Sequence, residues 1–124
     1  MGKYLYAEIT ERIIGAAFAV HNALGKGLSE KTYENALALK LRELGLDNEQ
    51  QKDLPIFFQN KRVGTQRVDI LVEEKIIVET KTVRSISQDH VTQVLGYLKN
   101  THYQLALLIN FGERVEIKRL ILTR

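Results

Sequence analysis

Two amphipathic helices are predicted for the first part of the chain. Apolar residues recur there at intervals of three or four, which is the helical period. The first stripe is formed by Ile13, Ala17, Val20 and Leu24, and the second by Tyr33, Leu37, Leu41 and Leu44. The pattern predicts helices over residues 8–24 and 30–44, with a glycine after each as the stop and Ser29 as the N-cap of the second. Because only the short linker GKGL joins them, they should form a helical hairpin.

After Gly45 the pattern becomes extended. The segment LPIFFQ, residues 54–59, carries the only proline of the chain near its start, as an edge strand tolerates. A turn at Asn60 and Lys61 and two apolar strands, 63–72 and 76–81, are expected next. A third helix should begin with a cap at Ser87 or Asp89 and end at Asn100. The last two elements are a strand buried on both faces, 103–111, and a strand of alternating pattern, 114–122.

The resulting element order, ααβββαββ, predicts an α/β fold. A mixed sheet of about five strands should be flanked by helices, with one parallel crossover attached to an antiparallel meander. The chain has 124 residues and shows no repeat and no internal linker. We therefore expect a single domain over residues 1–124.

Composition narrows the chemistry that this fold could carry. The net charge of +3 and the pI near 9.2 permit a polyanionic partner without requiring one. There is no cysteine, which excludes disulfides, thiolate metal sites and a cysteine nucleophile. A bound metal would therefore be a hard cation such as Mg²⁺ or Mn²⁺. No apolar run reaches the length of a signal peptide or a membrane span, so a cytoplasmic protein without membrane association is expected.

The segment RVDILVEEKIIVETKTV, residues 67–83, places charges within two apolar strands. Side chains alternate between the faces of a strand, so Glu79 and Lys81 share a face. If residues 73–75 form a loop of three, Asp69 falls opposite Glu79; if the loop has two residues, Asp69 faces away unless a bulge restores the register. Three-residue loops are common, which favours the first register.

Two opposed carboxylates would repel each other unless a cation neutralised them. Lys81 supplies one positive charge, and a divalent metal would supply two. An Asp, a Glu and a neighbouring Lys would therefore suit Mg²⁺, which prefers one or two carboxylates and keeps several waters. The tripeptide Glu-x-Lys is nevertheless common, and a solvated strand edge or a weak ion pair is the alternative interpretation.

Three motifs occur in order along the chain. They are GLSEKTY with Gly27, Glu30 and Tyr33, then Asp69 with ETK, then QVLGY with Gln93 and Tyr97; LLINFG at 107–112 and IKRLI at 117–121 follow. Together they resemble the bacterial GxxExxY family, a small branch of the PD-(D/E)XK nuclease superfamily. The resemblance implies a restriction-endonuclease-like core and a metal-dependent nuclease.

The resemblance also implies roles for individual residues. Catalytic roles fall on Glu30, Asp69, Glu79, Lys81 and Gln93. The metal, Mg²⁺ or Mn²⁺, would be held by Asp69, Glu79, Glu30 and the backbone carbonyl of Thr80. Gln93 and Tyr97 are four residues apart and share a helix face, as in a Q-x-x-x-Y motif. Contacts to substrate are expected from Tyr97, Tyr33, Arg67 and Arg84, although Tyr33 also suits the core and the arginines could be ordinary surface charges.

These residues favour a nuclease that hydrolyses phosphodiester bonds through a metal-activated water, on DNA rather than RNA. The alternative is a non-catalytic module that binds nucleic acid or protein on a nuclease-like fold. A homodimer is compatible with both, since the last two strands could supply an interface edge. The sequence contains no tract of interleaved aromatic and basic residues of the kind that stacks single-stranded bases.

Overall fold

The structure is a computed structural model that describes residues 5–123. The expected domain 1–124 also includes residues 1–4 and 124, which lie outside the described residues. Among the described residues, no helix combines the length and the apolar character needed to cross a membrane.

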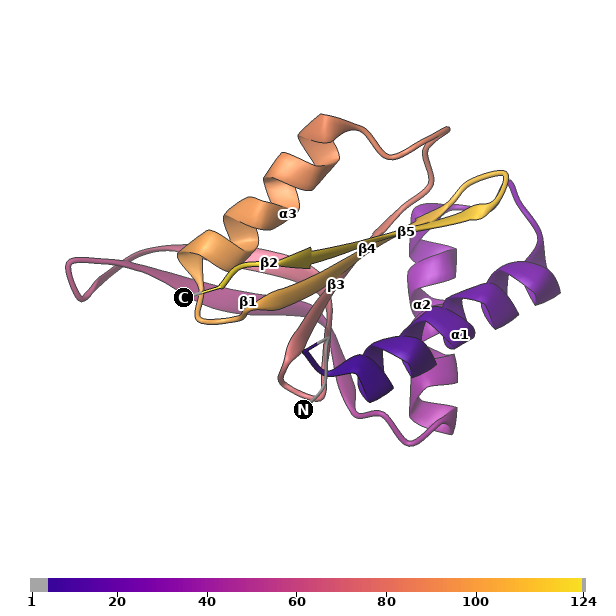
Figure 1. Ribbon diagram of the computed structural model, residues 1–124, viewed down its shortest axis with the longest axis horizontal. Coiled ribbons are helices and arrows are strands. Elements are labelled where there is room, and N and C mark those ends of the chain that lie inside the picture. The colour runs from indigo at the N-terminus through magenta and orange to yellow at the C-terminus, as the bar shows by residue number, and fades with distance from the viewer. Residues whose placement is uncertain (1–4, 124) are drawn as a thin grey trace.

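Two helices open the fold as predicted (Figure 1). They are α1 (Ala7–Leu24) and α2 (Glu30–Glu43). Gly25 and Gly45 follow them with φ of 76° and 80°, the left-handed backbone that glycine adopts without steric cost. Ser29 caps α2, since its Oγ accepts a hydrogen bond from the Thr32 amide at 3.2 Å. This cap fixes the first turn of α2, which carries Glu30.

The remaining elements build a five-stranded mixed sheet. The strands are β1 (Asn48–Phe58), β2 (Lys61–Val72), β3 (Ile76–Lys81), β4 (Leu105–Phe111) and β5 (Val115–Ile121), in the spatial order β1-β2-β3-β4-β5. All neighbours are antiparallel except β3 and β4, which are parallel and joined through α3 (Gln88–Asn100). The predicted α/β fold with order ααβββαββ is therefore confirmed.

Helices cover both faces of the sheet, and each face has its own apolar core (Figure 1). Ile76 and Val78 of β3 face α1 and α2, whereas Ile77 faces α3. Because side chains alternate along a strand, Glu79 belongs to the face that α3 covers. Strand β4 is buried along its whole length, as expected for a strand between two covered faces.

The first hairpin differs from its prediction. Strand β1 begins at Asn48, six residues before the expected start at Leu54, because the polar segment NEQQKD pairs with β2. The turn consists of Gln59 and Asn60, both with positive φ, rather than Asn60 and Lys61. This is the backbone of a two-residue hairpin loop. Strand β1 is an edge strand, so Pro55 is tolerated as predicted.

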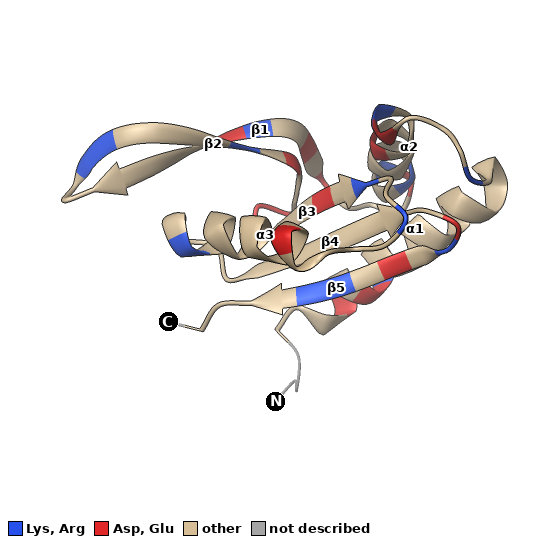
Figure 2. Ribbon diagram, turned by 90° about the horizontal axis from the view of Figure 1, so that it is seen from above, with Lys and Arg blue, Asp and Glu red and all other residues tan. Residues whose placement is uncertain are grey.

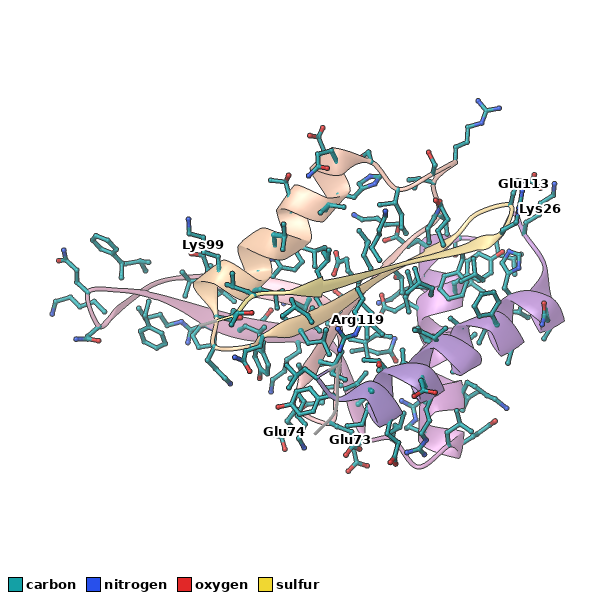
Figure 3. The ribbon with its side chains drawn as sticks, in the orientation of Figure 1. Lys26, Glu73, Glu74, Lys99, Glu113 and Arg119 are labelled. Atoms are coloured by element: carbon teal, nitrogen blue, oxygen red, sulfur yellow. The ribbon has the colours of Figure 1, made fainter. Side chains whose placement is uncertain are left out.

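The loop before α2 is held against the turn between β4 and β5. Figure 3 shows Lys26 and Glu113 together there, and their charged groups form an exposed ion pair. His21 Nε2 forms a hydrogen bond of 2.9 Å with the Gly112 carbonyl, and the Tyr33 hydroxyl donates to the Gly25 carbonyl. These contacts set where Glu30 meets the end of β3.

Candidate active site

The predicted acids meet where β2 and β3 separate. The ladder between β2 and β3 consists of the pairs Val72–Ile76, Leu71–Ile77 and Ile70–Val78. This confirms the register set by the three-residue loop 73–75. Asp69 and Glu79 are the next residues along this register. The Asp69 amide donates to Glu79 Oε1 at 3.3 Å, and the Thr80 amide donates to Asp69 Oδ2 at 2.9 Å. Side-chain bonds thus replace the ladder at this point, and both carboxylates lie in the gap.

Glu79 is more deeply buried than Asp69, with only 7% of its surface exposed. Burial raises its pKa to about 7, and the negative charge of Asp69 adds to the effect. The Tyr97 hydroxyl donates to Glu79 Oε2 at 3.4 Å. Burial and these two carboxylates in turn raise the pKa of Tyr97, so this hydroxyl stays a donor. Tyr97 therefore fixes the orientation of Glu79 from α3.

Thr80 contributes to the same gap through its backbone and its hydroxyl. Its Oγ1 bonds with Asp69 Oδ2 at 3.0 Å, beside the amide bond to the same oxygen. The N–H and C=O of one strand residue point toward the same neighbouring strand. Since the amide of Thr80 points at Asp69, we expect its carbonyl to face the gap as well.

Glu30 and Lys81 stand at the rim of this gap. Partial burial is the main cause that raises the pKa of Glu30; the charge of Asp69 raises it further, and the charge of Lys81 lowers it. Glu30 is thus within electrostatic reach of Asp69 and Lys81. Lys81 Nζ donates to Gln93 Oε1 at 3.3 Å, which ties β3 to α3. The structure therefore gathers Glu30, Asp69, Glu79, Lys81 and Gln93 around one end of β3.

The other expected substrate contacts lie elsewhere. Tyr33 is fully buried and its ring stacks on Phe111 with centroids 4.8 Å apart, so its described contacts belong to the core. Arg67 is exposed, and its guanidinium binds Asp53 with contacts of 2.7 and 3.1 Å. Arg84 is exposed in the loop between β3 and α3. The structure does not bring Tyr33 or Arg67 to the carboxylates of Asp69 and Glu79.

Two residues of the site were missed by sequence reasoning. Glu34 is only 3% exposed and accepts hydrogen bonds from Lys31 at 3.1 Å, Gln50 at 2.8 Å and Gln51 at 3.0 Å. The same Gln51 amide lies 3.4 Å from Asp69 Oδ1, so it bridges the two acids. Glu34 follows Glu30 by one helical turn, a spacing that could have indicated it.

Gln51 adopts a backbone conformation that is unusual for its residue type. Its φ is 52°, in the left-handed region that residues with a Cβ rarely enter. It lies in β1 opposite Asp69, between the ladder pairs Gln50–Ile70 and Lys52–Val68. Strained residues of this kind concentrate at functional sites. No sequence signal could have identified Gln51, because its segment was not expected to form a strand.

The donor set suits a hard divalent cation. Asp69 and Glu79 bring two carboxylates into a shielded gap, where burial and then the charge of Asp69 raise the pKa of Glu79, and a bound cation would stabilise the charged carboxylates. No group of three or more Asp, Glu, His or Cys side chains among residues 5–123 has the geometry of a ready metal cluster. Mg²⁺ needs only one or two carboxylates, with carbonyl and water oxygens completing its octahedron. The residues present therefore fit such an ion.

Comparison with known proteins shows which family has this arrangement of sheet and acids. The mixed sheet carries two acids where β2 and β3 part and a lysine two residues further along β3. A family model described as the PD-(D/E)XK nuclease superfamily matches residues 7–120. The chain belongs to the PD-(D/E)XK nuclease superfamily. No curated protein sequence matches it significantly.

Two solved structures are similar to this chain. The crystal structure of SSO0001 superposes with a TM-score of 0.59 at 20% identity, which shows likeness of fold. The match covers 93% of this chain and 58% of SSO0001, so this chain spans little more than half of that protein. An alkaline exonuclease (LHK-Exo) from Laribacter hongkongensis matches with a TM-score of 0.40 at 12% identity, over 96% of this chain and 83% of that one. This second likeness is too weak to add to the comparison of folds.

Proposed function

We propose that this protein is a Mg²⁺- or Mn²⁺-dependent nuclease of the GxxExxY branch, with DNA as its substrate. The observation that carries the proposal is the meeting of Asp69 and Glu79 at the parting of β2 and β3, with Lys81 two residues further along β3. Superfamily membership supports the same chemistry. The mild positive charge of the chain is compatible with a polyanionic substrate.

In this proposal, Asp69, Glu79 and the Thr80 carbonyl hold the metal, and Glu30 binds it directly or through water. When bound, the metal supplies a Lewis acid that polarises the phosphate and lowers the pKa of water. Gln51 and the Thr80 hydroxyl orient Asp69, while Tyr97 orients Glu79.

Lys81 is assigned to the attacking water. Its ammonium, held by Gln93 at 3.3 Å, orients that water and stabilises negative charge that develops on the phosphate. The water gives up a proton to solvent as its oxygen bonds to phosphorus, the bond from phosphorus to the leaving sugar oxygen breaks, and that oxygen takes up a proton from solvent. Arg84, exposed in the loop three residues after Lys81, is assigned a further phosphate contact.

Cleavage assays with Lys81→Ala test the proposal. Wild-type protein is incubated with plasmid DNA, linear DNA and RNA in Mg²⁺, Mn²⁺ or EDTA. We expect metal-dependent cleavage of DNA that falls by about 100-fold or more in the variant, the usual size of such a loss. Lys75→Ala, in the exposed turn between β2 and β3, is the matched control and should cut normally.

Failure of the purified protein to cut any substrate, or full activity of Lys81→Ala, would refute the proposed nuclease function. Calorimetry then separates the alternative, a non-catalytic module on the same fold. A protein that binds DNA in a salt-sensitive manner but takes up neither Mg²⁺ nor Mn²⁺ would match that alternative.

A further inference from the structure

The β1–β2 hairpin forms an arm that extends away from the rest of the sheet (Figure 2). Its ladder continues to the pair Phe58–Lys61, whereas the ladder of β2 with β3 stops at Ile70–Val78. At the usual rise of a strand, the backbone from Asp69 to Lys61 spans about 26 Å. The tip thus lies well outside the catalytic gap but is joined to it by one continuous strand.

The tip of this arm exposes large apolar side chains. Phe57 and Phe58 are 58% and 64% exposed, and Val63 is 62% exposed. Val63 is the extra residue of a bulge, because Phe57 pairs with Arg62 while Ile56 pairs with Gly64. Exposed aromatic rings on a projecting hairpin do not serve the core of this chain.

The same tip carries two positive charges. The cross-strand pairs Phe58–Lys61 and Phe57–Arg62 set each ring beside a basic residue, which corrects the expectation that aromatic and basic residues are not interleaved in this chain. Within the described part of the chain, neither Lys61 nor Arg62 forms an ion pair with an acidic side chain. Arg62 instead donates a hydrogen bond to Thr65 Oγ1 at 2.8 Å. Figure 2 shows the blue Lys and Arg segment near the tip of the arm.

A groove runs between the arm and the end of α3. It has a volume of about 540 Å³, with Phe57 on one wall and the stacked rings of His102 and Tyr103 on the other. Asp53 and Glu74 also line it, and Asp53 is neutralised by Arg67. The groove therefore combines aromatic rings with charged and polar side chains, among them Lys52, and the tip adds further positive charge. Lys99, in the last turn of α3, adds a further cation nearby (Figure 3).

We propose that this arm and groove bind an unpaired strand of the nucleic acid, so that the substrate contains a single-stranded segment next to the site of cleavage. The inference rests on the proposed nuclease function. A phenylalanine ring cannot read hydrogen-bonding groups, but it stacks on any exposed base, and the bases of a duplex have no free faces. Lys61 and Arg62 would contact the phosphates between the stacked bases.

Charge argues against a second copy of this chain as the occupant. In a two-fold dimer the same patch meets itself, so Lys61 and Arg62 of one tip would face Lys61 and Arg62 of the other. Without acids at the tip to neutralise them, these like charges would repel. A polyanion meets both the charge and the aromatic surface.

Binding measurements in EDTA with the Lys81→Ala variant as the parent protein test the proposal, because cleavage is then suppressed during the measurement. Fluorescence anisotropy compares a 30-nucleotide single strand, a blunt 30-base-pair duplex and the same duplex with a 12-nucleotide overhang. The variants are Phe57→Ala/Phe58→Ala and Lys61→Gln/Arg62→Gln on the arm. Phe18→Ala, which removes a ring of 46% exposure on α1, is the control.

The aromatic variant should lose about tenfold or more in affinity for the single strand and the overhang, the scale set by one or two stacked bases. Its affinity for the blunt duplex should be unchanged, as should all affinities of Phe18→Ala. The charge variant should bind every substrate more weakly, with a salt slope lower by about 1.4 for the single strand.

Equal affinity of the aromatic variant and its parent for all substrates would overturn the inference. So would a dimer, seen by light scattering, that dissociates in the aromatic variant, because the arm would then be a subunit interface. Arm-dependent binding by a wild-type protein that cuts nothing would refute only the nuclease. Cleavage with arm-independent binding would refute only the inference about the arm.

Discussion

At the scale of single residues, the feature with the clearest physical consequence is the buried carboxylate of Glu79. Its pKa of about 7 has two causes, burial and then the charge of Asp69. Between pH 4.5 and 7, folded metal-free protein holds a proton that the unfolded chain has released. The folded state binds more protons in this window, so its stability falls as the pH rises through it.

Glu79→Gln should remove this pH dependence. Glutamine has the same shape and cannot ionise, so the variant should be more stable than wild type at pH 8 by about 2–3 kcal/mol and similar to it near pH 5. Urea unfolding in EDTA at several pH values measures the difference. Glu74→Gln, in an exposed turn, is the control and should follow wild type. A Glu79→Gln curve parallel to wild type would show that Glu79 does not titrate in this range.

Gln51 offers a second prediction at this scale, because its strain and its hydrogen bonds can be separated. Alanine would remove the amide that bridges Glu34 and Asp69, at a cost of about 1–2 kcal/mol, and keep the Cβ at a φ of 52°. Glycine would remove the same amide but adopt that φ freely. Gln51→Gly should therefore unfold at higher urea than Gln51→Ala. The reverse order would mean that this conformation is not strained.

At the scale of elements, the loop between β3 and α3 depends on one buried side chain. Asn110 of β4 is fully buried; its Oδ1 accepts from the Val83 amide at 2.8 Å, and its Nδ2 donates to the Val83 carbonyl at 2.8 Å. The same Nδ2 donates to Glu116 Oε1 at 2.9 Å. The side chain of Asn110 thus holds the loop after Lys81 against β4 through two hydrogen bonds with the backbone of Val83.

Asn110→Ala should destabilise the protein by about 1–3 kcal/mol, because partly buried polar groups of Val83 would lose their partners. Asn100→Ala is the matched control: its side chain donates to the Gly96 carbonyl at the exposed end of α3, and its loss should cost under about 0.5 kcal/mol. Urea unfolding of both variants measures the contrast. Similar losses would show that the loop does not rely on Asn110.

At the scale of the whole molecule, metal binding and folding should be linked. An ion that binds only the folded state stabilises it by about 2.7 kcal/mol at 100 times its dissociation constant. Mn²⁺ should therefore raise the unfolding midpoint of wild type and leave Asp69→Asn nearly unchanged. Asp53→Asn, which removes an exposed acid of the arm, should respond as wild type does. Equal stabilisation of Asp69→Asn would place the metal elsewhere.

Assembly is a separate property at this scale. The sheet has two edge strands, β1 and β5, and either could pair with a second chain. A homodimer remains a prediction, and light scattering in EDTA and in Mn²⁺ would measure it.

The sequence by itself determined the order of elements and the cap of α2, and it favoured the register that sets Asp69 against Glu79. These depend on local properties: apolar period, glycine stops and the length of the loop at 73–75. The set of Glu30, Asp69, Glu79, Lys81 and Gln93 followed from motifs, and the structure gathers those residues at one end of β3.

Only the tertiary structure decided the features that depend on contacts between distant segments. The polar segment NEQQKD has no apolar period, and it becomes a strand because β2 offers it a ladder. That pairing brings Gln51 to Asp69 and Glu34, and burial raises the pKa of Glu79. It also carries Phe57 and Phe58 out on an arm beside Lys61 and Arg62. Such outcomes arise from packing, which local sequence patterns do not contain.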